Sequence, residues 1–99
     1  MTYIVIMGSY PPHKATEAGK AFLKAAKMPD YVKIEHVFIT SAGKYVFFVI
    51  YQITDDSKYF EGVKAIVKRY ASYREIEGYE YFIYPVLEAK DALSLIGLA

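Results

Sequence analysis

The chain has 99 residues, of which 55% are hydrophobic and 23% are charged, and its 12 basic and 11 acidic side chains leave a formal net charge of +1. This balance gives no electrostatic basis for binding nucleic acid or an anionic membrane, and the absence of cysteine excludes disulfides and thiol catalysis. No apolar run approaches the roughly 20 residues that span a bilayer, so we expect one cytoplasmic domain over residues 1–99.

The first half of the chain predicts a strand followed by a helix. Residues 3–9 form a short β-branched run without helical period, which indicates a buried strand. Tyr10-Pro11-Pro12 ends this strand, because proline cannot donate to a ladder. From His13 to Lys27, apolar and small residues recur at helical spacing, which predicts an amphipathic helix suited to close packing on a sheet.

The second half predicts a hairpin, a helix and a last strand. We expect strands over residues 31–40 and 45–53, joined by a turn at the sequence SAGK. A second helix with an apolar stripe begins after Asp55-Asp56-Ser57, which can cap its first turn. The fourth strand spans residues 79–87, and the tail, residues 88–99, has room for one or two helical turns. The order β-α-β-β-α-β is that of the ferredoxin-like α+β fold, a four-stranded antiparallel sheet with two helices on one face.

Pairing the hairpin sorts its side chains onto two faces. With the turn centred on Ala42 and Gly43, paired residue numbers sum to 85, which places His36 opposite Val49. A three-residue loop would shift this register. We assign the helices the plainer aliphatic face, which holds Ile4, Ile6, Gly8, Val37, Ile39, Val46, Phe48 and Ile50. The other face then holds an aromatic set around His36, made of Tyr3, Val5, Met7, Ile34, His36, Phe38, Tyr45, Phe47, Val49 and Tyr51.

Ten such positions left bare would be an aggregation hazard, so we expect this face to be covered. The cover could be a second copy of the chain, a single-stranded nucleic acid stacked on the aromatic rings, or the C-terminal tail. The nucleic-acid alternative lacks a basic surplus, and "GKYVFFVIY" matches the RNP1 pattern only in part.

The element order with two apolar sheet faces resembles the dimeric α/β-barrel group of ferredoxin-like proteins. More narrowly, "YPPHKATEAGKAFLKA", "IEGYEYFIYPVLEAKDAL" and "LIGL" are similar to segments of small uncharacterised prokaryotic proteins with this pattern. The resemblance implies a homodimer or a larger homo-oligomer. The group includes monooxygenases, dismutases and isomerases, and the likeness carries no activity over to this chain.

The aromatic set predicts a ligand site. We expect a small apolar or aromatic molecule to bind between sheet and helices or between subunits, with walls that include Tyr3, Met7, His36, Phe47 and Tyr51. His36 could act as a general base near neutral pH, as in a cofactor-independent monooxygenase or isomerase. Alternatively, it could bond to a tyrosine across the subunit interface or be a partly exposed residue of an edge strand. The contrasting alternative is a structural oligomerisation module without a ligand.

A secondary polar site is predicted from Tyr10, His13 and Gln52, which we expect to converge at one end of the sheet near helix N-termini that favour anions. The alternative is that Pro12 and His13 only start a helix. The two histidines lack metal-ligand spacing and the glycines are isolated, so we expect no metal and no cofactor.

Overall fold

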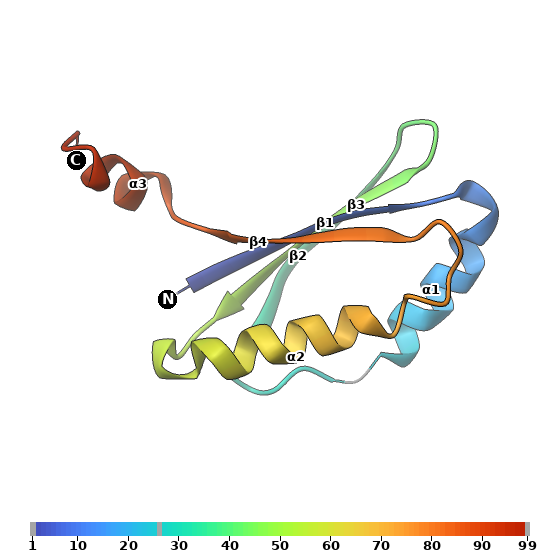
Figure 1. The fold of residues 1–99 in the computed structure, drawn as a ribbon, viewed down its shortest axis with the longest axis horizontal. Coiled ribbons are helices and arrows are strands. Elements are labelled where there is room, and N and C mark those ends of the chain that lie inside the picture. The colour runs from blue at the N-terminus through green and yellow to red at the C-terminus, as the bar shows by residue number, and fades with distance from the viewer. Residues whose placement is uncertain (1, 26, 99) are drawn as a thin grey trace.

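The computed structural model describes residues 2–25 and 27–98. Position 26 of the predicted first helix and position 99 of the predicted tail, like position 1, lie outside the described residues. The elements are β1 (Thr2–Tyr10), α1 (Ala15–Lys24), β2 (Val32–Ser41), β3 (Tyr45–Ile53), α2 (Tyr59–Ala71), β4 (Glu80–Val86) and α3 (Ala89–Leu95), with short 3-10 turns at Pro12–Lys14 and Asp56–Lys58 (Figure 1). The expected α+β class is confirmed, and α3 follows the last strand.

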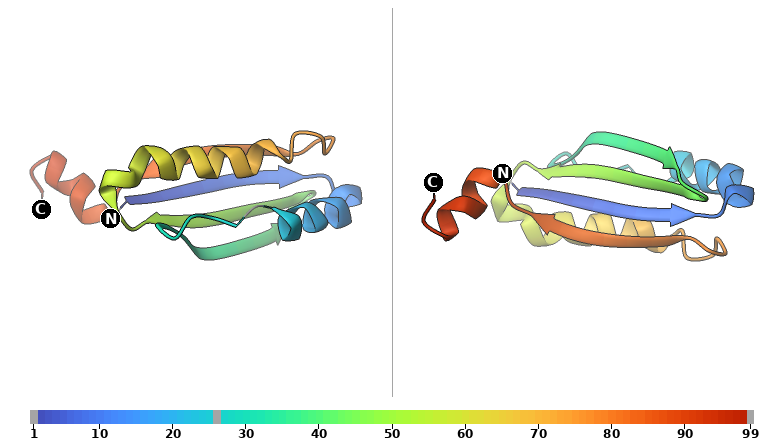
Figure 2. Two further views of the ribbon diagram at one scale, coloured as in Figure 1. Left: turned by 90° about the horizontal axis from the view of Figure 1, so that it is seen from below. Right: turned by 90° about the horizontal axis from the view of Figure 1, so that it is seen from above.

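The four strands form one antiparallel sheet in the order β2-β3-β1-β4, so β2 and β4 are its two edges. Both α1 and α2 cover the same face of this sheet (Figure 2). The core lies between them and is built from fully buried side chains of the two central strands and of α2, namely Ile4, Ile6, Val49, Tyr51, Ile53, Ile66 and Tyr70. We call the opposite side, which no helix covers, the open face.

The helix starts follow the signals in the sequence. The Asp55 carboxylate accepts hydrogen bonds from the Ser57 amide at 3.0 Å and the Ser57 hydroxyl at 2.7 Å, which confirms the expected cap ahead of α2. These two bonds hold the pKa of the exposed Asp55 carboxyl below its usual value. The first helix begins with a 3-10 turn at Pro12, because proline loses no hydrogen bond at this position.

The predicted register of the hairpin is wrong over most of its length. The strands are joined by a three-residue loop, Ala42 to Lys44, in which Gly43 takes a φ of 81°. His36 consequently pairs with Ile50 and not with Val49. A bulge between Ile34 and His36 absorbs one residue, so only the far end of the hairpin, where Ile34 pairs with Tyr51, keeps the expected register.

The face assignment of β3 is also wrong, although that of β1 is right. Phe47, Val49 and Tyr51 point to the helices and are 5%, 1% and 0% exposed. The reason is their pairing with the central strand, where Tyr51 lies opposite Ile4 and Val49 opposite Ile6. Directly opposed residues of antiparallel strands share a face, so Val46, Phe48 and Ile50 belong to the open face.

The C-terminal tail does not cover the open face. Figure 2 shows α3 beyond the ends of the strands, outside the outline of the sheet. No helix among the described residues is long and apolar enough to cross a membrane.

Candidate ligand site

The five residues predicted to line one ligand site lie on two sides of the sheet. Tyr3 and Met7 belong to the open face, together with His36 on the edge strand β2. His36 is exposed and its ring stacks on Phe38 with a centroid distance of 5.3 Å. Phe47 and Tyr51 are buried beneath the helices. The predicted set therefore does not form one wall.

The predicted convergence of Tyr10, His13 and Gln52 is wrong. Tyr10 pairs with Tyr45 at the start of β3, whereas Gln52 pairs with Tyr3. These two pairs are seven positions apart along β1, which corresponds to roughly 23 Å. Antiparallel pairing of β1 with β3 imposes this separation. Gln52 instead donates a 3.4 Å hydrogen bond to the Tyr3 hydroxyl, and His13 is exposed in the 3-10 turn before α1.

A hollow of about 130 Å³ lies between α1 and the sheet. Two small residues of the helix, Ala18 and Gly19, leave this space open, and a Cβ added at Gly19 would meet no atom within 4 Å. Exposed side chains of the edge strand, Val37 and Ile39, stand at its margin. The remaining lining residues are mostly aromatic: Tyr10, Phe22, Phe47, Val49, Tyr70 and Tyr79. Of the predicted ligand walls, Phe47 is the one that lines this hollow.

The aromatic residues of the hollow belong to a larger buried cluster. Tyr10 stacks on Tyr79 at 5.9 Å, and Tyr79 stacks on Tyr73 at 4.8 Å. Below them, the hydroxyls of Tyr51 and Tyr70 are 2.9 Å apart and share a hydrogen bond. Burial raises the pKa of Tyr70 and Tyr79 far above the usual tyrosine value. These hydroxyls therefore stay neutral at physiological pH, and the floor of the hollow carries no tyrosinate charge.

This shift predicts loss of stability in alkali. Unfolded tyrosines ionise near pH 10, whereas Tyr70 stays protonated in the fold, so the contribution of Tyr70 to stability is constant below about pH 10 and falls above it. Each such tyrosine contributes a slope of up to about 1.4 kcal/mol per pH unit. Urea unfolding measured between pH 8 and 11 checks this expectation. Tyr70→Phe should reduce the slope, and an unchanged slope would contradict the assignment.

Arg69 is a buried cation at the border of this cluster. Its guanidinium lies 4.8 Å from the centre of the Phe22 ring, and its Nη2 donates a 3.4 Å hydrogen bond to the Phe22 carbonyl. Phe22 lies in the last turn of α1, and its carbonyl also accepts a 3.4 Å hydrogen bond from the Ala25 amide that follows the helix. Arg69 thereby ties α2 to the end of α1. Its charge also opposes the burial that raises the pKa of Tyr51 and Tyr73.

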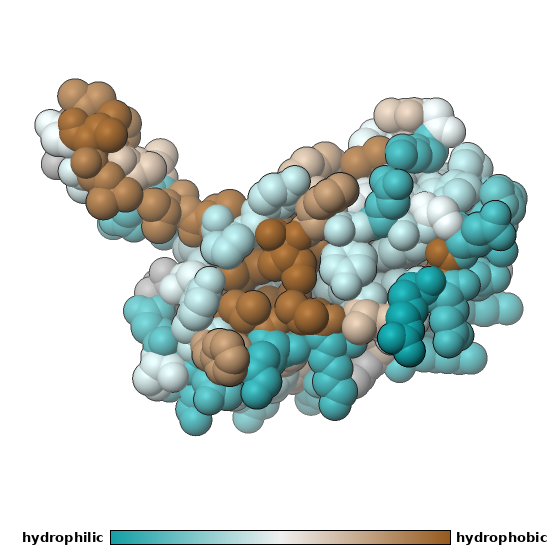
Figure 3. Space-filling model, in the orientation of Figure 1, coloured by the Kyte–Doolittle hydropathy of each residue, from teal (hydrophilic) through white to brown (hydrophobic). Residues whose placement is uncertain are grey.

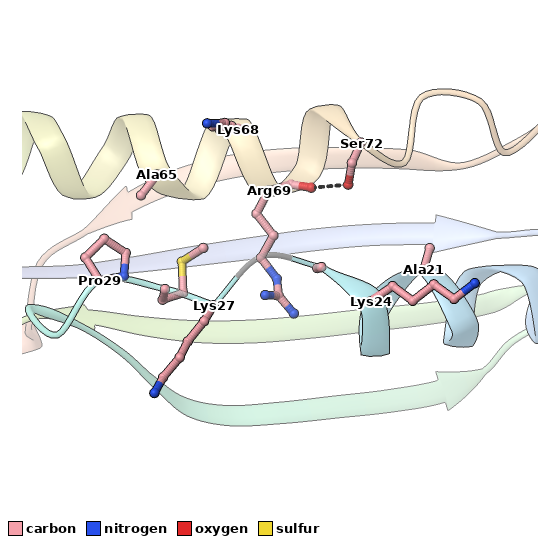
Figure 4. A pocket seen from close by; sticks show the side chains of 10 residues that line it. Ala21, Lys24, Lys27, Pro29, Ala65, Lys68, Arg69 and Ser72 are labelled. Atoms are coloured by element: carbon pink, nitrogen blue, oxygen red, sulfur yellow. Dashed lines mark hydrogen bonds between the residues drawn. The ribbon is translucent and has the colours of Figure 1, made fainter.

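A second, larger cleft of about 570 Å³ separates α2 from the end of α1 (Figure 4). Its described lining residues include the cations Lys24, Lys27, Lys68 and Arg69 and no carboxylate. Figure 4 shows Arg69 pointing between the helices, while the three lysine side chains point away from one another. Ser72 donates its hydroxyl to the Arg69 carbonyl at 2.6 Å. The lysines therefore charge the rim of the cleft without converging on one anion.

The middle of the open face is apolar, whereas Ser9, Thr40 and Glu80 lie at one end and Lys33 and Gln52 at the other. Its edge strands carry some of the most exposed rings, with Phe38 on β2 at 52% and Phe82 on β4 at 57%. Between them the central strands contribute Tyr3, Val5, Met7, Val46, Phe48 and Ile50. No group of three or more His, Asp or Glu side chains within residues 2–25 and 27–98 is placed to hold a metal ion.

The sequence carries one signal for the hollow, the small-residue face of α1, which predicts close packing on the sheet. Nothing in the local pattern connects Ala18 and Gly19 to the aromatic rings beneath them. That connection requires the helix to be docked on a particular part of the sheet.

Comparison with known proteins gives a fold and no function. No family model and no curated protein matches the chain. Among solved structures, the de novo designed protein Foldit4 is similar, with a TM-score of 0.58 over 89% of this chain and 99% of that chain, at 15% sequence identity. At this identity the likeness concerns the arrangement of the elements alone.

Proposed function

We propose that this protein is a homo-oligomeric binding protein for a small apolar or aromatic molecule, which it takes up in the hollow beneath α1. The observation that carries the proposal is the lining of the hollow by aromatic and aliphatic side chains. Apolar cavities of about 150 Å³ stay dry and bind ligands of the size of benzene. A hollow of about 130 Å³ is suited to a single ring.

The walls favour a flat, uncharged ligand. Tyr10 and Tyr79 present stacked rings, and Phe47 lies 5.5 Å from Tyr79 at a tilt of 37°. Aromatic pairs in such stacked or tilted arrangements are worth about 0.5–1.5 kcal/mol beyond the burial of their area. A charged ligand would lose its hydration here, because none of the described lining residues carries a charge.

The open face supports the homo-oligomeric part of the proposal. Contiguous apolar patches of more than a few hundred Å² are rare on monomers and mark interaction sites. The sheet order is that of the ferredoxin-like fold. We favour a dimeric α/β barrel in which two copies stack through their open faces, since stacked sheets bury apolar side chains of both partners.

A cavity-filling variant tests ligand binding. Gly19→Leu should fill the hollow and abolish binding, while folding is retained because leucine favours a helix over glycine by up to about 1 kcal/mol. Lys20→Leu is the matched control, since it adds the same side chain at an exposed position of α1. Binding of indole and of benzene is measured by chemical-shift changes in NMR titrations.

Wild type and Lys20→Leu should bind one of these probes, and Gly19→Leu should bind neither. A wild-type protein that binds neither probe, or a Gly19→Leu variant that binds as well as wild type, would overturn the ligand proposal. A dimer without ligand binding would favour the structural oligomerisation module. The monooxygenase or isomerase alternative has less support, because His36 lies on the open face and the described lining of the hollow contains no imidazole or carboxylate.

A further inference from the structure

The C-terminal segment, residues 87–98, projects from the body of the protein (Figure 1). The radius of gyration is 14.9 Å, whereas a compact domain of this length has about 13 Å. The longest axis, 47 Å, greatly exceeds the next, 29 Å. We call this projecting segment the arm.

The arm is apolar and unpartnered in the single chain. Its large apolar side chains, at Leu87, Leu93, Leu95, Ile96 and Leu98, are between 41% and 78% exposed. In Figure 3 the end of the chain that carries α3 is a hydrophobic knob, at the upper left. Helical spacing places Ala89, Ala92, Leu93 and Ile96 on one stripe of α3, with Lys90, Asp91 and Ser94 opposite. A helix of seven residues is marginal in water without a surface to pack against.

The short connection to β4 directs the arm away from its own sheet. Only Leu87 and Glu88 separate β4 from α3, and Glu88 has extended backbone angles of −63° and 148°. Reversal within two residues usually needs glycine, proline or asparagine, none of which occurs here. The arm therefore continues past the strand ends instead of turning back over the open face.

The edge strand β2 offers an apolar surface for such an arm. Ile34, Val37 and Ile39 lie on the helix side of the sheet, because they pair with the buried residues of β3, yet all three are exposed. Two copies stacked through their open faces would leave these side chains uncovered. Closing the stacked sheets into a barrel joins the β4 edge of each copy to the β2 edge of the other, since these are the two edges of the sheet.

The area of the open face also favours an additional contact. The four strands have 9, 10, 9 and 7 residues, so the open face is about 19 Å wide and about 29 Å long on average, or roughly 550 Å² in projection. A standard interface buries roughly 800 Å² on each partner. The arm can supply the remainder.

We propose that the arm of each chain packs onto Ile34 and Val37 of β2 in a second copy of the chain. The occupant of this surface is thus another copy of the same protein, and the proposal rests on the self-association proposed above. The apolar stripe of α3 faces the partner, and Lys90 and Asp91 face solvent.

Cysteine cross-linking tests this contact, because the chain contains no cysteine of its own. Leu93→Cys is mixed with Ile34→Cys or with Val37→Cys, oxidised with copper phenanthroline, and analysed by non-reducing electrophoresis and mass spectrometry. A disulfide forms only when the Cα atoms approach to about 4.4–6.8 Å. Asp91→Cys, on the opposite side of α3, is the matched control.

We expect one of the Leu93→Cys mixtures to give at least about five times more mixed disulfide than the same mixture with Asp91→Cys. The Leu93→Glu/Ile96→Glu variant should also raise the dissociation constant of the dimer about tenfold or more in sedimentation equilibrium. A wild type that stays monomeric at every concentration would refute the self-association itself. A dimeric wild type without preferential cross-linking would overturn the arm contact alone. An internal disulfide in the Ile34→Cys/Leu93→Cys chain at high dilution would overturn it too, because the arm would then contact β2 of its own chain.

Discussion

Phe47→Ala is expected to lower the free energy of unfolding by about 3–5 kcal/mol. The ring of Phe47 is buried beneath the helices, where it packs 6.5 Å from Tyr70 and 5.5 Å from Tyr79. Gly8 lies directly opposite on β1, and a Cβ there would overlap the Phe47 ring. Because the backbone approaches the ring so closely, removing the ring leaves a cavity that neighbouring side chains cannot easily fill.

Phe48→Ala is the matched control, since it removes the same ring from the next residue on the open face. We expect it to cost the monomer less than half as much, because Phe48 is only partly buried. Urea unfolding at several protein concentrations separates the two effects: the Phe47 loss should be independent of concentration, whereas the Phe48 loss should grow as dimer forms. Equal losses at low concentration would contradict the observed faces of β3.

Phe82→Lys is expected to raise the dissociation constant of the proposed dimer by about a hundredfold or more. Phe82 is 57% exposed on the open face of β4, so a lysine there costs the monomer little. In a stacked dimer the ammonium group would be buried against apolar side chains without a partner, which is strongly unfavourable.

Sedimentation velocity over a range of concentrations measures this effect, and circular dichroism checks that the fold is retained. Leu23→Lys, at an exposed position of α1 outside the open face, is the control and should dimerise like wild type. If both variants associate as wild type does, the open face is not the interface between copies.

The site combines features that differ in how far they could be predicted. The resemblance to dimeric barrels and the two apolar sheet faces suggested a ligand among aromatic rings, and Phe47 does line the hollow. The other wall of the hollow comes from Ala18 and Gly19, which are far from Phe47 in the sequence. They become part of the site only through the docking of α1 on the sheet. The same docking brings Arg69 to the carbonyl of Phe22, a contact that no local pattern indicates.

The sequence by itself determined the order and approximate limits of the elements. Alternating and helical periodicity, interrupted by Tyr10-Pro11-Pro12, SAGK and Asp55-Asp56-Ser57, was sufficient for this, because such patterns act over a few residues. The two faces of β1 could also be predicted from the sequence, since Ile4, Ile6 and Gly8 follow the two-residue alternation of a strand.

Only the tertiary structure decided the faces of β3 and the position of the polar residues. Both faces of this strand are apolar, so its hydrophobic pattern does not distinguish them, and a shift of one residue exchanges every side chain. The choice was made by pairing with β1, by the extra residue of the Ala42–Lys44 loop and by the bulge before His36. Antiparallel pairing of β1 with β3 likewise separated Tyr10 from Gln52. The end of β1 lies beside the start of β3, so Tyr10 is next to Tyr45 and far from Gln52.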